Sequence, residues 1–160
     1  MHFYFYEPQI TGDYGEHTEY APPDFIDVVK MHYEFARWPQ DDMQWCGYSF
    51  IGTDRLKNAL EAVSPPLSGI EFHPAKISGD KQEFERVWRK GRPLSALGVW
   101  YWFKITGKPG VHDFGQAYRS MDLVVSERVV EVLKQFTVIN SGRKIQPWKG
   151  EIEAGRVPQK

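Results

Sequence analysis

Apolar residues form two kinds of pattern along the chain. Runs without a helical period predict strands, and segments with a helical period predict helices. Residues 2–6 (HFYFY) and Leu97–Thr106 (LGVWYWFKIT) are continuous apolar runs without a helical period, as expected for strands buried on both faces. The second of these runs is the most apolar and predicts a central strand. Pro74 predicts that residues 67–78 form an edge strand or contain a β-bulge, because proline has no N–H to donate to a neighbouring strand. The strands predicted are 2–6, 25–38, 45–51, 67–78, 97–106 and 122–125.

Two helices are predicted from a helical period combined with a capping residue. Thr53 precedes Leu56, Ala59, Leu60 and Val63, which recur at spacings of three and four. Ser126 precedes a second amphipathic segment, whose apolar positions are Val129, Val130, Val132, Leu133 and Phe136. A short third helix is expected to begin at Asp80, which resembles a capping box with Glu83, and to end near Gly91.

Loops account for the rest of the chain. Residues 11–24 mix glycine, proline and acidic residues, residues 39–44 form a turn, and residues 107–110 (GKPG) form another. The segment after Ser141 is basic and without a period, and residues 150–160 are expected to be a loose tail. The pattern predicts an α+β fold in a single domain over residues 1–160, with a mainly antiparallel sheet.

An internal repeat links the two principal helices. Residues 48–60 (YSFIGTDRLKNAL) and 121–133 (MDLVVSERVVEVL) both run from an apolar strand through a hydroxyl residue and an acid to arginine. Residues 29–38 and 99–107 also correspond loosely, as aromatic strands that end in turns. An internal duplication explains this pattern, and recurrence of ordinary capping chemistry is the alternative.

The most informative feature of the composition is the uneven distribution of charge along the chain. The 160 residues carry a net charge of −1, but residues 1–80 hold 5 Lys and Arg against 13 Asp and Glu, and residues 81–160 hold 15 against 8. An acidic first half either attracts the second half or presents a surface to a basic partner.

The cysteine content and the hydropathy of the chain indicate the cellular compartment. Cys46 is the one cysteine, which excludes an internal disulfide and a multi-cysteine zinc site. The first residues lack the charge and the apolar run of a signal peptide, and no apolar run reaches the roughly 20 residues of a membrane span. We therefore expect a soluble, cytoplasmic protein with no membrane contact.

Candidate catalytic groups are sparse. The five histidines never occur at metal-ligand spacing, so neither a metal nor another cofactor is expected. His112 beside Asp113 could form an acid–base pair, although a polar surface pair is the simpler interpretation. Cys46 lies in an apolar segment and is interpreted as a buried small hydrophobe. No catalytic residue is assigned, and the protein is not expected to be an enzyme.

The second half of the chain holds basic and aromatic residues of the kind that bind nucleic acid. No phosphate-binding loop of the GxxxxGK[ST] type occurs, and the acidic first half opposes binding to a polyanion. Nucleic acid is therefore not expected as a partner. The basic and aromatic residues considered were Arg86, Trp88, Arg89, Lys90, Arg92, Arg143, Lys144, Trp148 and Lys149.

The turn between two predicted strands is the candidate partner-binding site. Asp41 and Asp42 lie in this turn, where exposure is expected, and Trp38 and Trp45 flank them. Tryptophan is a frequent anchor of protein interfaces, and exposed charges steer association.

Four short motifs, together with Leu133, resemble a known group of proteins. They are His32–Phe35 (HYEF), Thr53–Leu56 (TDRL), His112–Gly115 (HDFG), Leu123–Arg128 (LVVSER) and Leu133. The chain resembles, over residues 25–140, the small α+β immunity-type proteins of bacterial polymorphic toxin systems. This group includes domains of unknown function related to the myxobacterial immunity domain.

The resemblance implies a cytosolic protein that binds and neutralises a cognate toxin, which the acidic first half suggests is basic. It carries over no catalytic residues, and the paired cysteines of some related immunity proteins are missing here. An uncharacterised enzyme or a small-ligand-binding protein is the alternative. An enzyme should show a deep pocket with convergent polar groups, whereas an inhibitor should show an acidic, aromatic surface.

Overall fold

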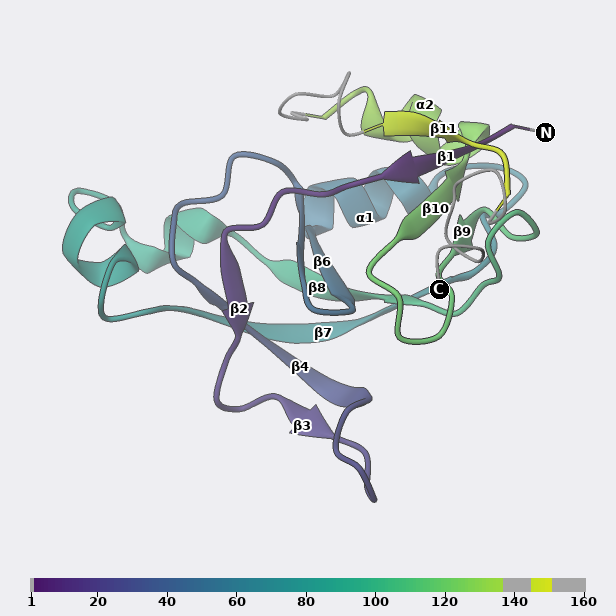
Figure 1. Ribbon diagram of the computed structural model, residues 1–160. Helices are drawn as coiled ribbons and strands as arrows, with labels where there is room; N and C mark the ends of the chain where they lie inside the picture. The colour runs from purple at the N-terminus through teal and green to yellow at the C-terminus, as the bar shows by residue number, and fades with distance from the viewer. Residues whose placement is uncertain (1, 137–144, 151–160) are drawn as a thin grey trace.

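The computed structural model describes residues 2–136 and 145–150, which form one α+β domain with two β-sheets and two α-helices (Figure 1). This confirms the predicted fold class, including the mainly antiparallel pairing. The residues after 150 lie outside the described residues, and so does the tail predicted for them.

The larger sheet has seven strands in the order β2-β4-β7-β8-β6-β5, with β3 paired to β4. All neighbours are antiparallel except β4 and β7. Its two ends approach each other, because Gln9 forms a parallel bridge to Gln44 of β5. The strands are β2 (Gly12–Tyr14), β3 (Glu19–Tyr20), β4 (Val28–Phe35), β5 (Met43–Cys46), β6 (Ser49–Thr53), β7 (Ile70–Gly79) and β8 (Trp100–Ile105).

The smaller sheet has four antiparallel strands in the order β11-β1-β10-β9. They are β1 (Phe3–Tyr6), β9 (Phe114–Gly115), β10 (Leu123–Ser126) and β11 (Ile145–Trp148). Strand β11 corrects the expectation of an unstructured segment after Ser141. Its ladder partner is β1, which lies at the other end of the sequence, so the local pattern alone did not indicate a strand.

Both principal helices begin where they were predicted. Helix α1 (Asp54–Glu61) and helix α2 (Glu127–Leu133) follow β6 and β10 directly, with Thr53 and Ser126 as their N-caps. The third helix is a π-helical turn, Phe84–Trp88, whose entry is capped by the Asp80 carboxylate through the N–H groups of Glu83 and Phe84. A short 3₁₀ helix, Leu94–Leu97, was not predicted.

Two strand predictions need correction. Residues 45–51 do not form one strand but cover the end of β5, the turn at residues 47–48 and the start of β6, and Gly47 adopts a positive φ of 52° in this turn. Pro74 lies in a central strand and not at an edge. Residues Ile70–Pro74 pair with β8 and Ala75–Gly79 pair with β4, so the proline falls where β7 changes partner.

Two hydrophobic clusters lie on opposite faces of the larger sheet. Along β6 and β8, alternate residues enter alternate clusters, as the two-residue period of a strand requires. Phe50 and Phe103 pack with both α-helices and with β10, whereas Ile51 and Trp102 pack with β4 and the π-helical turn. The aromatic run in β8 is therefore buried on both faces, as predicted, whereas in β1 only Tyr6 is fully buried.

The two halves of the chain repeat one arrangement. Strand β6 followed by α1 and β7 matches β10 followed by α2 and β11, and Pro74 follows Thr53 at the same interval as Pro147 follows Ser126. The pairing registers also match. Thr53 pairs with Trp100 and Ser126 with Phe3, while Pro74 pairs with Tyr101 and Pro147 with Tyr4.

This register identifies β1, and not β4, as the counterpart of β8. The predicted correspondence of residues 29–38 with 99–107 is therefore wrong, because it matched two aromatic strands by composition. Strand β1 pairs with β10 and β11 of the second half, and β8 pairs with β6 and β7 of the first. Each half thus contributes its first strand to the sheet of the other half. Residues 12–35, which hold β2, β3 and β4, have no counterpart and are called the insert.

No helix within residues 2–136 and 145–150 is long and apolar enough to cross a membrane.

The matched helices supply a direct test of the core. Leu60 and Leu133 occupy equivalent positions on α1 and α2 and are both buried in the same cluster. We expect Leu60→Ala and Leu133→Ala each to lower the free energy of unfolding by about 2 to 5 kcal/mol, measured by denaturant titration. Glu131→Ala, an exposed change on α2, is the control and should have an effect within about 0.5 kcal/mol. Neutral effects of both leucine changes would contradict the helix-face assignment.

Candidate functional site

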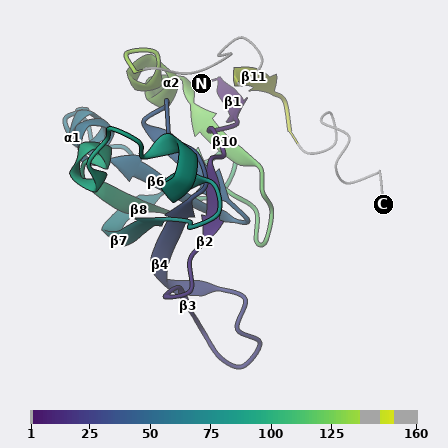
Figure 2. The ribbon, with the colours of Figure 1, turned by 90° about the vertical axis from the view of Figure 1, so that its left-hand side faces the viewer.

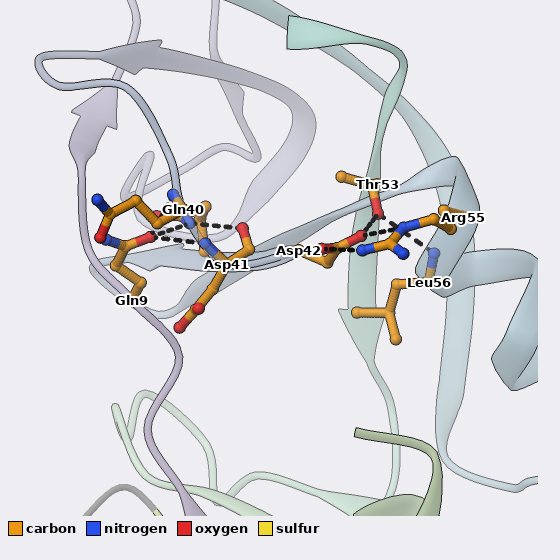
Figure 3. A network of polar contacts seen from close by, with 8 residues as sticks. Gln9, Gln40, Asp41, Asp42, Thr53, Arg55 and Leu56 are labelled. Atoms are coloured by element: carbon orange, nitrogen blue, oxygen red, sulfur yellow. Dashed lines mark hydrogen bonds and ion pairs between the residues drawn. The ribbon is translucent and has the colours of Figure 1, made fainter. Parts of the chain in front are cut away.

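The turn predicted to bind a partner is buried. Asp41 and Asp42 are 3% and 9% exposed, which contradicts the expected exposure. Asp42 accepts hydrogen bonds from the Thr53 hydroxyl at 2.6 Å and from the Arg55 guanidinium at 2.8 and 3.1 Å (Figure 3). The Thr53 hydroxyl in turn accepts the N–H of Leu56. Asp42 therefore fastens the start of β5 to the start of α1.

The neighbouring Asp41 is held through its backbone. Its N–H donates to Gln9 Oε1, which also accepts from the N–H of Gln40 and the amide of Gln44 (Figure 3). The Gln44 amide also donates to the carbonyl of Asp41. The turn is thus tied to the segment after β1 from inside the protein.

The two flanking tryptophans lie on different packing surfaces. Trp38 stacks on Phe84 at a centroid distance of 5.6 Å, and the Arg92 guanidinium lies 5.1 Å from its ring centre. Trp45 is partly buried against the other cluster, and its buried indole N–H has no hydrogen-bond partner. Trp38, Asp41, Asp42 and Trp45 therefore do not form one exposed surface.

Asp113 occupies the equivalent place in the second half. Its carboxylate accepts hydrogen bonds from the hydroxyl of Ser126 at 2.7 Å and from the N–H and hydroxyl of Ser68, and Arg128 lies at 3.6 Å. Burial alone would raise the pKa of this carboxyl. The hydrogen bonds from Ser68 and Ser126 and the charge of Arg128 outweigh burial and hold the pKa below its usual range.

We call each set of aspartate, cap hydroxyl and arginine a clasp: Asp42–Thr53–Arg55 in the first half and Asp113–Ser126–Arg128 in the second. Sequence comparison found the hydroxyl and the arginine of each clasp but missed the aspartate. The reason is that 11 positions separate Asp42 from Thr53 and 13 separate Asp113 from Ser126. An alignment without gaps cannot match them.

His112 and Asp113 do not form an acid–base pair. The Nδ1 atom of His112 accepts the N–H of Lys108, and the Asp113 carboxylate accepts the hydroxyl of Ser126 within the second clasp. Cys46 is buried, as predicted, and burial raises the pKa of its thiol far above its usual range. No group of three or more potential metal ligands occurs among the described residues.

The insert is an acidic and largely exposed part of the structure. It holds six acidic residues and one lysine, and its β3 end projects from the body of the protein (Figures 1 and 2). Phe25, Ile26 and Val29 expose 61%, 40% and 55% of their surface there. The exposed acidic residues of the insert are Asp13, Glu16, Glu19, Asp24 and Asp27.

Residues 116–122, the loop between β9 and β10, hold the tip of the insert in place. Arg119 forms an ion pair with Asp24 at 2.6 Å and lies 3.7 Å from Asp27, and the Tyr118 hydroxyl donates to Asp27 at 3.1 Å. Phe25 and Arg119 are the two non-glycine residues with positive φ among the described residues. A backbone strained on both sides of one contact is typical of functional loops.

An aromatic groove of about 280 Å³ runs between these loops. Its wall includes Tyr14, Ile26, Tyr48, Tyr118 and Arg119. Tyr118 is 74% exposed and Tyr48 is 42% exposed. Exposed tyrosines beside apolar and charged residues have the composition of a protein-binding surface.

The other end of the insert is organised around a buried histidine. His32 is 3% exposed, its Nδ1 accepts the N–H of His17, and its Nε2 lies 2.7 Å from the Ser78 hydroxyl. Burial lowers the pKa of His32, and the nearby charges of Lys76 and His17 add to this effect. The neutral ring therefore fixes the turn before β3.

The exposed acidic surface of the first half lies in the insert and not at the predicted turn, where Asp41 and Asp42 are buried. The acidic character of the first residues was recognised, but residues 11–24 were interpreted as a loop. Residues 11–24 form an ordered edge of the larger sheet because β2 and β3 pair with β4. The contact with residues 116–122 joins distant parts of the sequence and left no local signal.

Comparison of the chain with protein-family models and with curated proteins finds no match.

The second clasp generates a prediction of pH dependence. The unfolded Asp113 carboxyl takes up a proton near pH 3.9, whereas the folded one does so only at lower pH. The clasp therefore contributes stability above about pH 4 that is lost as the pH falls further. Asp113→Asn should lower the free energy of unfolding by about 2 to 4 kcal/mol at pH 7 and flatten its decline below pH 4.

Denaturant titrations at several pH values measure both effects. Asp13→Asn, a change at an exposed position, is the matched control and should leave the pH profile of the native protein intact. If the free energy of unfolding of Asp113→Asn depended on pH as that of the wild type does, the clasp would not hold an ionised carboxylate.

Proposed function

We propose that this protein binds another protein through the insert and residues 116–122, and that the partner is a toxin which it neutralises. The observation that carries the proposal is the contact of Arg119 and Tyr118 with Asp24 and Asp27. This contact holds an acidic, aromatic surface in one conformation. A surface fixed before binding loses less conformational entropy when the complex forms.

The nature of the partner follows from the charge and from the resemblance. Acidic side chains around exposed apolar residues favour a basic protein, since complementary fields raise the association rate. The similarity of four short motifs to immunity-type proteins of bacterial toxin systems supports a toxin as the partner. On this proposal the protein acts in the cytoplasm of a bacterium.

A growth assay tests the proposal. The toxin candidate is the product of an effector gene adjacent to the gene for this protein, expressed in bacterial cells with and without the protein. Rescue of growth together with a stable complex of the two purified proteins is expected. Failure of rescue by the wild-type protein, when the candidate is toxic, would contradict neutralisation of that candidate.

Variants of the insert test the surface itself. Phe25→Asn retains a residue type that tolerates positive φ but removes the exposed ring, so it should weaken the complex by about tenfold or more. Glu16→Lys with Glu19→Lys should slow association and reduce its salt dependence, measured by surface plasmon resonance. Val87→Asn, an equally exposed change on the π-helical turn, is the control. Unchanged binding in both insert variants would place the interface elsewhere.

A further inference from the structure

A second hollow, separate from the clasps, lies on the side of the smaller sheet. It has a volume of about 980 Å³, at the upper end of the range typical of small-molecule sites. Three parts of the chain form its wall: residues 106–109 with His112, residues 116–118, and residues 148–150. We refer to it as the β11 cavity. It shares Gln116, Ala117 and Tyr118 with the aromatic groove, and the rest of its wall takes no part in the proposed toxin surface.

The charge of the β11 cavity is opposite to that of the insert. Lys108 and Lys149 line it, and no acidic side chain is among the described residues of its wall. Within those residues neither lysine takes part in an ion pair. Two ammonium groups with no carboxylate among the described residues of the wall favour an anion, because ammonium groups are hydrogen-bond donors only.

Polar groups of the wall add donors to the two ammonium groups. His112 Nδ1 accepts the Lys108 N–H at 2.9 Å, which leaves the proton of the neutral ring on Nε2 as a donor. Gln116 and Thr106 also line the cavity. The Gln116 amide already donates to the carbonyls of Tyr48 and Ser120, which fixes this part of the wall.

The remaining wall is flat and aromatic. Trp148 of β11 packs edge-on against Phe3 at 6.1 Å, and Tyr118 is largely exposed. A Cβ atom at Gly110 would overlap the Trp148 ring, so the glycine lets the turn of residues 107–110 lie against the indole. Gly110 also has a positive φ of 78°. Aromatic walls of this kind bind flat apolar groups by stacking.

The turn is rigid before any ligand arrives. The N–H groups of Thr106 and Gly107 donate to the carbonyl of Gly69, and the N–H of Gln116 donates to the carbonyl of Gly107. A wall fixed by backbone hydrogen bonds retains its shape when empty, which is typical of small-molecule sites.

From these observations we infer that the β11 cavity binds a small organic anion that carries an aromatic ring. The anionic group lies between Lys108 and Lys149, and the ring lies against Trp148. A phosphate ester and a carboxylate share this chemistry, so both are tested. Adenosine 5′-monophosphate and 2-naphthoate serve as probes, with adenosine and 2-naphthamide as their neutral counterparts.

Isothermal titration calorimetry at low ionic strength gives the first result. At least one anionic probe is expected to bind with a Kd below about 1 mM, and its neutral counterpart should bind at least about tenfold more weakly. Binding of one probe alone identifies a phosphate or a carboxylate as the preferred group. No binding of either anion, or equal binding of anion and neutral counterpart, would overturn the inference.

Charge variants then locate the site. Lys108→Gln with Lys149→Gln should raise the Kd of the probe by about tenfold or more, because both ammonium groups are lost. Lys81→Gln with Lys90→Gln removes the same charge at exposed positions outside the cavity wall and should leave binding unchanged. All four changes are at exposed side chains, so thermal unfolding should stay as in the wild type. Equal effects of the two pairs would show that the anion binds by net charge and not in the β11 cavity.

Discussion

A buried carboxylate at the base of a hairpin is the constraint on which the rest of the structure depends. Asp42 and Asp113 each bind the hydroxyl that caps the next helix, and each lies close to the arginine two positions beyond that cap. A buried carboxylate without such partners is costly, so the hairpin and the helix are held together. The clasps fix where each helix begins, and therefore which helix face meets the shared core.

The two halves share the clasp but differ in the surfaces they present. In the larger sheet, Ile51 and Trp102 are buried beneath the insert and the π-helical turn. Their counterparts in the smaller sheet, Val124 and Phe5, lie beneath the turn and loop of residues 107–122. The second half has no insert there, and the wide β11 cavity lies on this side. One arrangement therefore supports an acidic protruding surface in one half and a basic hollow in the other.

Local signals in the sequence predicted most of the elements but few of their partners. Thr53 and Ser126 predicted both helix starts, because capping depends on residues within one turn. Strand β11 and the aspartates of the clasps were missed, since their partners lie far away in the sequence or across a gap in the repeat. The predicted binding turn failed for the same reason. Polar character indicated exposure for Asp41 and Asp42, whereas distant partners bury them.

The exchange of first strands between the halves is the central claim, and native-state hydrogen exchange tests it most directly. If β1 and β8 each complete the sheet of the other half, neither half can open alone. Leu133→Ala should then lower the opening free energies of the slowest amides in β6 and in β10 by the same amount. A reduction confined to β10, with β6 as protected as in the wild type, would contradict the exchange.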